Sequence, residues 1–337
     1  MTDVRIVPLD PLTDDAQLAG WVDAGMDSAR HELGERHTQY TATEGRERSR
    51  TMTDRRFVLL AALVGDLVVA EGNVHLPVLD NLHLATSWMS VRPAWRRKGI
   101  GTLLLHALQA AARADCRTTH VVVAESSAGG GSEAAPFAAR HGYSAARVNV
   151  RSDLEVDPRL PDRLAAMQAA AERASPDYEL MTWWDAVPEP WLAQRAELSA
   201  RMATDAPAEE VDSGEELWDA DRVRAEVAAV RAMGRRLVET VAVHTATGQA
   251  VAFTTLVVAE SAPDHAYQWD TLVLADHRGY GLGTRVKAAN LLALLERLPA
   301  VRRVTTWNAR TNEPVLAVNR AMGFHPIGAS TEWQRIG

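Results

Sequence analysis

A segment of eight residues, rich in arginine and glycine, occurs twice in the chain. It reads "WRRKGIGT" at residues 95–102 and "HRGYGLGT" at residues 277–284. When Gly281 is aligned with Gly99, the two copies lie 182 positions apart. Neighbouring positions keep this register or miss it by one residue: Arg96 with Arg278, Val91 with Val273, and Gly142 with Gly323. A register that holds across a strand, a loop and a helix predicts that the chain contains a duplicated domain.

The same order of predicted elements surrounds each copy. A hairpin, a strand, the glycine segment, a helix, a strand, a short helix and a closing strand follow one another at residues 56–156 and again at residues 237–336. Alternating strands and helices predict an α/β fold with a mixed sheet in each half. We therefore expect an N-terminal domain at residues 1–156, a linker helix at residues 157–176, where prolines punctuate the sequence, and a C-terminal domain at residues 177–337.

Composition agrees with this organisation. A length of 337 residues exceeds what a single core usually holds. The single cysteine, Cys116, excludes an intramolecular disulfide, and the sequence shows neither a signal peptide nor an apolar run of membrane-spanning length. These features predict a cytoplasmic protein with no membrane partner and, because the histidines are not spaced as ligands, no metal. The net charge of −8 argues against nucleic acid and is compatible with a cationic substrate.

Each glycine segment stands between a predicted strand and a predicted helix. The first turn of a helix carries unpaired N–H groups and a partial positive charge. Glycines just before the helix let the backbone turn these N–H groups toward a ligand, which suits an anion such as phosphate. A dinucleotide fingerprint would need a third glycine at Leu104 and at Thr284, and a P-loop would need a Gly-Lys-Ser/Thr sequence. Neither copy meets these requirements, so both alternatives fail.

Both copies contain the pattern arginine-x-x-glycine-x-glycine, as "RRKGIG" and "RGYGLG". With this pattern and this order of elements, the sequence resembles the GNAT superfamily, the Gcn5-related N-acetyltransferases, and in particular its tandem two-domain members. The resemblance covers residues 5–156 and 178–336. It implies two tandem GNAT domains, each a mostly antiparallel, splayed sheet flanked by helices. It also implies that each glycine loop holds the pyrophosphate of acetyl-CoA, or of another acyl-CoA, while the pantetheine arm lies in the gap beside the splayed strand.

The cofactor-binding residues that this resemblance implies come from the strand end and the loop of each half. In the first half they are Met89, Ser90, Val91, Arg96, Arg97, Lys98, Gly99, Ile100, Gly101 and Thr102. In the second half they are Leu272, Val273, Leu274, Arg278, Gly279, Tyr280, Gly281, Leu282, Gly283 and Thr284. The segment "TTWNARTNEPVLAVNRAMGF" resembles the closing segment of actinobacterial tandem GNATs, which implies that Asn308, Asn312 and Asn319 face the cofactor arm or the acceptor. A strand-end cap, a helix N-cap at Asn312 and a surface amide are the alternatives.

Acyl transfer from a thioester to an amine needs a base, stabilisation of the oxyanion and a proton for the thiolate. A backbone N–H of the splayed strand would polarise the thioester carbonyl. On the strand before the second loop Asp270 is the candidate base, whereas the aligned residue of the first half is Trp88.

Many GNATs place a tyrosine four residues before the closing glycine as the acid. Here Asn319 and Ala138 occupy those positions, and only Asn319 can donate a hydrogen bond. We therefore expect Asp270 and Asn319 to be catalytic, and the N-terminal domain to be structural or inactive.

The predicted function is an acyl-CoA-dependent N-acyltransferase that acts on a primary amine of a small molecule, as a monomer or a homodimer. A non-catalytic acyl-CoA-binding or sensing protein and a protein N-acetyltransferase are the alternatives. Glu239 and His244 are rival bases on the second hairpin, where each would otherwise be a cross-strand surface partner. The acidic run from Glu209 to Asp221 is compatible with a cationic acceptor or with a solvated helix start.

Overall fold

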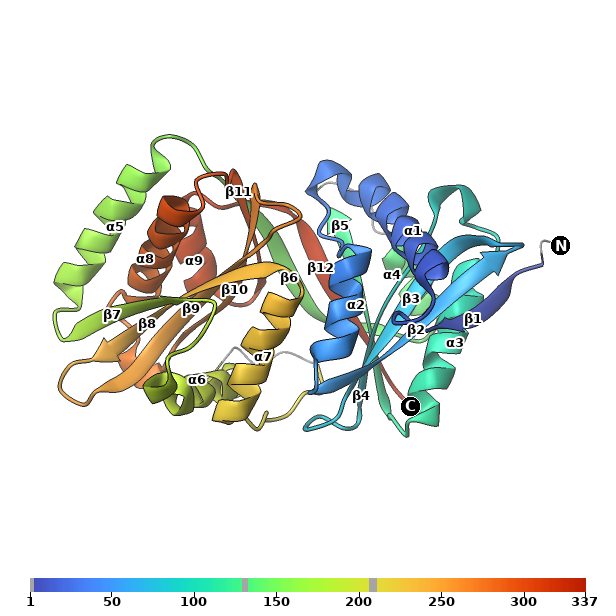
Figure 1. The fold of residues 1–337 in the computed structure, drawn as a ribbon, viewed down its shortest axis with the longest axis horizontal. Coiled ribbons are helices and arrows are strands. Elements are labelled where there is room, and N and C mark those ends of the chain that lie inside the picture. The colour runs from blue at the N-terminus through green and yellow to red at the C-terminus, as the bar shows by residue number, and fades with distance from the viewer. Residues whose placement is uncertain (1–2, 129–132, 206–210) are drawn as a thin grey trace. The chain divides into compact units, whose positions relative to one another are not determined.

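The computed structural model describes residues 3–128, 133–205 and 211–337. The chain divides into two compact units, whose elements are labelled in Figure 1. The first unit contains Met1–Val148, Glu209–Gly214 and Gly328–Gly337, and the second contains Asn149–Ala208 and Glu215–Ile327. Among the described residues, no helix is both long enough and apolar enough to cross a membrane.

The first unit is a mixed sheet with helices on both faces. Its strands lie in the order β1, β2, β3, β4, β5, β12, and all neighbours are antiparallel except β4 and β5, which are parallel. The elements are β1 (Arg5–Leu9), α1 (Asp15–Leu33), α2 (Ala42–Thr51), β2 (Arg55–Val64), β3 (Leu67–Pro77), β4 (Leu84–Val91), α3 (Ile100–Ala114), β5 (Thr119–Ser127), α4 (Ala134–Arg140) and β12 (His325–Ile336).

Two consecutive residues of β3 show which helix covers which face of this sheet. Successive side chains of a strand point to opposite faces. A Cβ atom built at Gly72 would lie 3.1 Å from Leu108 of α3, whereas Glu71 contacts α1, where a Cβ atom at Gly25 would lie 3.4 Å from its carboxylate. Helix α3 therefore packs closely on one face because position 72 has no side chain, and α1 covers the other face.

The predicted splay of the sheet is present in the first unit. The parallel ladder between β4 and β5 begins at Leu84 with Thr119 and ends at Ser87 with Val122. The last four residues of β4 therefore continue past the end of this ladder, toward the glycine loop. A ligand that can hydrogen-bond an open strand edge fits along this stretch.

The second unit repeats this architecture. Its strands lie in the order β6, β11, β10, β9, β8, β7, and β10 and β11 are the parallel pair. Figure 1 shows α8 and α9 on one side of these strands and α6 and α7 on the other. The elements are β6 (Ser144–Glu155), α5 (Leu160–Ala174), β7 (Tyr178–Trp184), α6 (Leu192–Asp205), α7 (Ala220–Ala232), β8 (Arg235–His244), β9 (Gln249–Ala259), β10 (His265–Val273), α8 (Leu282–Arg297), β11 (Arg303–Ala309) and α9 (Glu313–Met322).

Both glycine segments lead into a helix, as predicted. Gly99 is the N-cap of α3 with φ of 82°, and Gly281 is the N-cap of α8 with φ of 76°. This left-handed backbone is costly for residues that have a Cβ atom, so glycine is the residue that suits each helix start. The local structure of the two loops is therefore determined by their sequence.

The closing strands are exchanged between the two halves of the sequence. We assigned residues 144–156 to the first domain and residues 325–336 to the second. In the structure, residues 149–155 of β6 pair with β11, and residues 328–336 of β12 pair with β5. The segment expected as a linker, residues 157–176, contains α5, which packs on α8 inside the second unit. The compact units therefore differ from the ranges that the sequence suggested.

Candidate active site

In the first unit, Arg96 ties the glycine loop to the end of β4. Its Nε donates to the carbonyl oxygen of Val91 at 3.1 Å, and its other nitrogens donate to Glu32 at 2.5 Å and to Ser28 at 2.9 Å. Arg278 makes the equivalent bond to Val273 at 3.1 Å in the second unit. In both copies, the arginine before the glycines thus holds the strand end and the helix start together.

A cavity of about 690 Å³ opens from the first glycine loop. At one end it is lined by loop and helix residues that a cofactor would contact: Met89, Ser90, Val91, Arg96, Arg97, Gly99, Gly101, Thr102, Phe137 and Ala138. At the other end it is lined by residues of α1, α2 and β3. A volume of this size is typical of sites that bind small molecules and cofactors. One continuous cavity can therefore hold both an acyl-CoA arm and an acceptor.

Two predicted cofactor residues of this loop have other roles for their side chains. Lys98 donates to the carbonyl oxygen of Ala94 at 3.1 Å and lies over the ring of Trp95. Ile100 is a core residue with 1% of its surface exposed. The buried side chain of Ile100 is not available to a phosphate, whereas the exposed ammonium group of Lys98 keeps donors besides the one bonded to Ala94.

A buried carboxylate faces this cavity from β3. Glu71 lies opposite Ser90 in the register of β3 and β4, and the hydroxyl of Ser90 donates to its Oε1 at 2.8 Å. Glu71 is only 5% exposed, and this burial raises the pKa of its carboxyl group to about 7, against the hydrogen bond from Ser90, which lowers it. A carboxylate with a pKa near the ambient pH is suited to general base catalysis.

Glu71 is not among the site residues that we predicted from the sequence, and Ser90 was predicted only as a cofactor contact. A signal was available, because Glu71 is the only acidic residue in "LVVAEGNVHL", a mostly apolar strand. Carboxylates are rarely buried without a partner or a function.

Although Ala138 stands where many GNATs have a tyrosine, another phenol, that of Tyr143, lines the cavity. The hydroxyl of Tyr143 accepts a hydrogen bond from Gln109 at 2.9 Å and is bonded to Nδ1 of His120. Nε2 of His120 is bonded to the hydroxyl of Ser87 at 2.8 Å. Burial lowers the pKa of His120 to about 4, so its imidazole is neutral at neutral pH. The phenol is held in place by a neutral network rather than by a charge.

In the second unit, the predicted asparagines contact each other or cap a helix. Nδ2 of Asn319 donates to Oδ1 of Asn308 at 2.7 Å, and Asn319 is 2% exposed. Asn312 is the N-cap of α9, with its side chain accepting from the N–H of Val315 at 3.4 Å. The helix-cap alternative therefore describes Asn312.

In the second unit, side chains occupy the space that corresponds to the first cavity. Lys287 lies at the position of Leu105, 182 residues later, and is 1% exposed with its ammonium over the ring of Phe324. Burial lowers the pKa of Lys287 to about 7. Ala171 of α5 packs against the second loop, 3.7 Å from where a Cβ atom of Gly281 would lie. Among the other predicted residues of this half, Leu272, Leu274 and Leu282 are buried in the core and Tyr280 is exposed.

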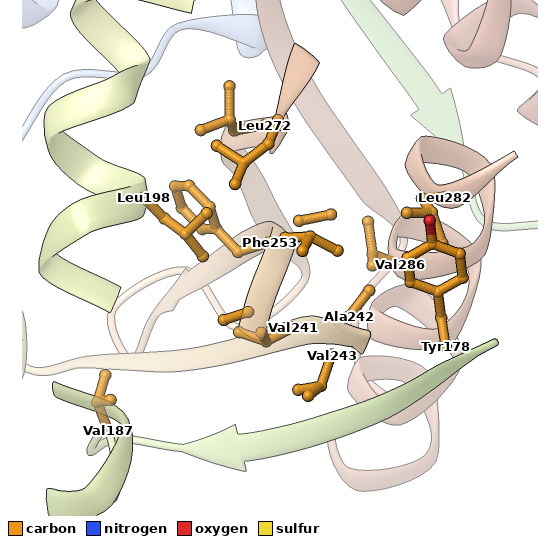
Figure 2. Close-up of a cluster of buried hydrophobic side chains, with 14 of the residues drawn as sticks. Tyr178, Val187, Leu198, Val241, Ala242, Val243, Phe253, Leu272, Leu282 and Val286 are labelled. Atoms are coloured by element: carbon orange, nitrogen blue, oxygen red, sulfur yellow. The ribbon is translucent and has the colours of Figure 1, made fainter. Parts of the chain in front are cut away.

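The positions that correspond to Glu71 and Ser90 are apolar in the second unit. Phe253 pairs with Leu272 across β9 and β10, as Glu71 pairs with Ser90 across β3 and β4. Figure 2 shows Phe253 and Leu272 together with Leu198 of α6 in the hydrophobic core. Phe253 is fully buried. The second unit therefore has no carboxylate at the place where the first unit has Glu71.

Asp270, the base predicted from the sequence, lies elsewhere in the second unit. It lies within a bulge between Gln268 and Thr271 and lines a smaller cavity of about 310 Å³ with Gln268, Trp269 and Trp307. Its side chain is accessible to solvent, but its concave surroundings raise the pKa of its carboxyl group, and Arg195 opposes this effect. Asp270 thus stays a rival base.

The contacts of Glu239 indicate a structural role for this residue. Its carboxylate accepts hydrogen bonds from Arg195 at 2.8 Å, Thr255 at 2.9 Å and Trp183 at 3.1 Å, and it is 2% exposed. A buried carboxylate with three donors is engaged in holding its neighbours. The other rival, His244, is bonded to Thr247 at the hairpin turn.

We expect Glu239→Gln to destabilise the protein by about 3 kcal/mol, because it leaves Arg195 as a buried charge without its counter-ion. Urea unfolding measures this loss, and the exposed Glu197→Gln on the same helix as Arg195 is the control. The turnover of the folded variant should equal that of the wild type. A loss of turnover without a loss of stability would contradict the structural role.

Comparisons with known proteins agree with this geometry. Residues 54–145 match the family model of the acetyltransferase (GNAT) domain. A tandem GNAT protein from the clavulanic acid biosynthesis pathway, solved without acetyl-CoA, is 28% identical, with a TM-score of 0.79 over 99% of this chain and 98% of that chain. A GCN5-related N-acetyltransferase from Sphaerobacter thermophilus is 15% identical, with a TM-score of 0.67 over 99% and 95% of the two chains, and shows the fold. No curated protein matches.

The splayed strands, the two glycine loops and these likenesses define the class of the protein. The chain contains a GNAT acetyltransferase domain and shares the fold of a tandem GNAT protein over nearly its whole length, and these likenesses support an acyl-CoA-dependent N-acetyltransferase. The sequence-based prediction of the family and of the mixed α/β fold is confirmed.

Proposed function

We propose that the protein transfers an acetyl group, or another short acyl group, from CoA to the primary amine of a small molecule, and that this transfer takes place in the cavity of the first unit. One observation carries the proposal: Glu71 and the first glycine loop line the same cavity. This location differs from our sequence-based expectation, which placed the chemistry at Asp270 because the aligned Trp88 offers no base. Glu71, on the neighbouring strand, supplies the missing carboxylate.

The cavity suggests a role for each group. The N–H groups at the start of α3 hold the pyrophosphate of the acyl-CoA, and the pantetheine arm lies along the end of β4, on the edge that β5 leaves open. A backbone N–H among residues 89–91 polarises the thioester carbonyl. Glu71 accepts a proton from the ammonium group of the acceptor, and the resulting amine attacks the carbonyl carbon. The C–S bond then breaks, the nitrogen loses its second proton as the amide forms, and the thiolate of CoA takes up that proton.

The second unit has a supporting role in this proposal. Phe253, Leu272 and Lys287 occupy the places of Glu71, Ser90 and Leu105, so its core is built for stability rather than for an acceptor. The acidic run, which is compatible with a cationic acceptor or with a solvated helix start, includes Glu209 and Glu210, which lie outside the described residues.

Release of CoA thiol by the purified protein, with acetyl-CoA and a panel of amines, tests the proposal. Glu71→Gln and Asp270→Asn form a matched pair, because each removes one candidate base and keeps its shape. We expect turnover with at least one class of primary amine, a large loss in Glu71→Gln and no loss in Asp270→Asn. The reverse pattern would move the chemistry to the second unit. A protein that binds acetyl-CoA and releases no thiol with any amine would contradict the proposal.

A further inference from the structure

The end of the first cavity beyond Glu71 indicates what kind of acceptor it takes, and this inference rests on the proposed function. Glu71, Asn73 and His75 occupy alternate positions of β3, so all three face the cavity. The glycine loop lies at the Glu71 end, since Glu71 pairs with Ser90, next to the end of β4. Four residues of a strand span roughly 13 Å. An acceptor whose amine reaches Glu71 therefore extends along this row toward His75.

A guanidinium group lines the cavity at the His75 end. Arg48 of α2 lies with its guanidinium carbon 5.0 Å from the ring centre of Phe57 and 5.1 Å from that of Tyr40. Phe57 is the register partner of His75, and their rings are 4.7 Å apart. Burial first, and then the charges of Arg48 and Arg55, hold the pKa of His75 well below its usual range. The imidazole is therefore neutral, and Arg48 supplies the charge that faces the cavity here.

Other charged groups near this end point elsewhere. Glu44, four residues before Arg48 on the same helix, accepts hydrogen bonds from the N–H and the hydroxyl of Thr41 in a capping box. Asp54 is paired with Arg55 at 2.5 Å. Of these four charged residues, Arg48 is the one that lines the cavity. A guanidinium has five N–H donors, so Arg48 can bind a ligand carboxylate besides its protein neighbours.

Between the two charged ends, Asn73 offers a hydrogen-bond acceptor. Its Oδ1 is buried and has no hydrogen-bond partner among the described residues. Asn73 pairs with Trp88 across β3 and β4, and both residues line the cavity. A buried acceptor without a partner is costly, so a donor group on the middle of a bound molecule would stabilise it.

We propose that the acceptor is an elongated zwitterion, with its primary amine at Glu71 and a carboxylate at Arg48. The ammonium group meets a carboxylate at one end, and the carboxylate meets a guanidinium at the other. A diamine of the same length would place its second ammonium beside Arg48, where two like charges repel. The rings of Phe57 and Tyr40 surround the guanidinium at the carboxylate end, and Trp88 pairs with Asn73 in the middle of the row.

The test compares ω-amino acids of about four to ten carbons, whose extended lengths of roughly 6 to 14 Å bracket the span of the row, with the alkyl amines and the diamines of the same length. We expect the wild type to use the longer amino acids with kcat/KM at least about tenfold higher than the matched alkyl amines, as one charge-assisted contact provides. Arg48→Gln should raise KM for the amino acids about tenfold and abolish this preference. Arg50→Gln, an exposed residue two positions away that pairs with Glu47, should keep it.

Binding of the same compounds, measured by calorimetry on the CoA-loaded protein, gives a readout that does not need turnover. Tighter binding of the amino acids by the wild type, lost in Arg48→Gln, supports the inference. Equal kcat/KM and equal affinity for amino acids and alkyl amines would overturn it, and so would a preference that survives in Arg48→Gln. Turnover of alkyl amines without any preference would overturn this inference alone, whereas the absence of thiol release with every amine would overturn the proposed function.

Discussion

Replacing Glu71 by glutamine should lower kcat by about 10²- to 10⁴-fold, which is the usual contribution of a general base. Glutamine has nearly the same shape and can still accept the hydrogen bond that Ser90 donates to Oε1. The affinity for acetyl-CoA should therefore stay within a factor of about two. Stopped assays of thiol release measure kcat, and calorimetry measures the affinity. A variant that loses acetyl-CoA binding in proportion to kcat would show that Glu71 supports the cavity instead of accepting a proton.

The pH dependence gives a second readout for the same residue. The base acts when it is ionised, so kcat/KM of the wild type should rise with pH through about 7, where Glu71 titrates. In Glu71→Gln this rise should disappear, and only the titration of the acceptor amine should remain. Asp270→Asn is the control, and its profile should match that of the wild type. An unchanged rise through pH 7 in Glu71→Gln would assign that titration to another group.

Because burial raises the pKa of Glu71, ionisation of this residue should destabilise the folded protein. A salt-bridged acid has the opposite effect, since its ionisation stabilises the fold. The folded-state pKa of about 7 lies above the reference value of 4.5, so the folded protein binds this proton more tightly than the unfolded chain. The free energy of unfolding should be unaffected by Glu71 below pH 4.5 and should fall between pH 4.5 and 7, by about 3 kcal/mol in total. Glu71→Gln should therefore be more stable than the wild type at pH 8 and equally stable near pH 4. Urea unfolding at the two pH values tests this, and equal stabilities at pH 8 would contradict the burial of an ionisable Glu71.

The second large effect is expected at the first glycine loop. Gly101→Leu should weaken acetyl-CoA binding and lower kcat/KM by at least about 100-fold. The reason is that the leucine side chain would occupy part of the volume that the cofactor needs. Gly101 is not in the left-handed region, and a Cβ atom there would lie 3.6 Å from Phe137 and 3.7 Å from Val91, so the first atom of a side chain fits. The outer atoms of leucine would extend into the cavity that Gly101 lines. The variant should fold, since leucine is a good helix former at the start of α3.

The internal repeat provides a matched control for this variant. Gly283 occupies the equivalent position of the second loop, and a Cβ atom there would lie 3.8 Å from Val273. Gly283→Leu should leave kcat/KM within about twofold of the wild type if the second unit takes no part in the chemistry. Calorimetry with acetyl-CoA reports binding, and circular dichroism reports folding. A loss of turnover in Gly283→Leu with none in Gly101→Leu would restore our sequence-based expectation of chemistry in the C-terminal half.

Side-chain pairing across strands explains why the base was missed. In the internal repeat, Asp270 aligns with Trp88 on the strand that precedes each loop, and neither residue indicates the base of the first unit. In the structure, the Glu71 carboxylate comes from the neighbouring strand, and Ser90 lies opposite it. The helices α1 and α2, which our reading of the sequence did not predict, close the far side of the cavity and bring Arg48 to it. An acceptor site built from three separate segments has no local pattern that a single sequence reveals.

The sequence by itself determined the duplication, the order of elements and the two phosphate loops, because these depend on local properties. Gly99 and Gly281 adopt positive φ where a Cβ atom would be strained, and the spacing of arginine and glycine follows from one strand end meeting one helix start. Only the tertiary structure decided which strand closes each unit and which half contains a carboxylate beside an open cavity. The alternation of side chains suits β6 and β12 equally well to either sheet, and the pKa of Glu71 arises from burial by residues distant in sequence.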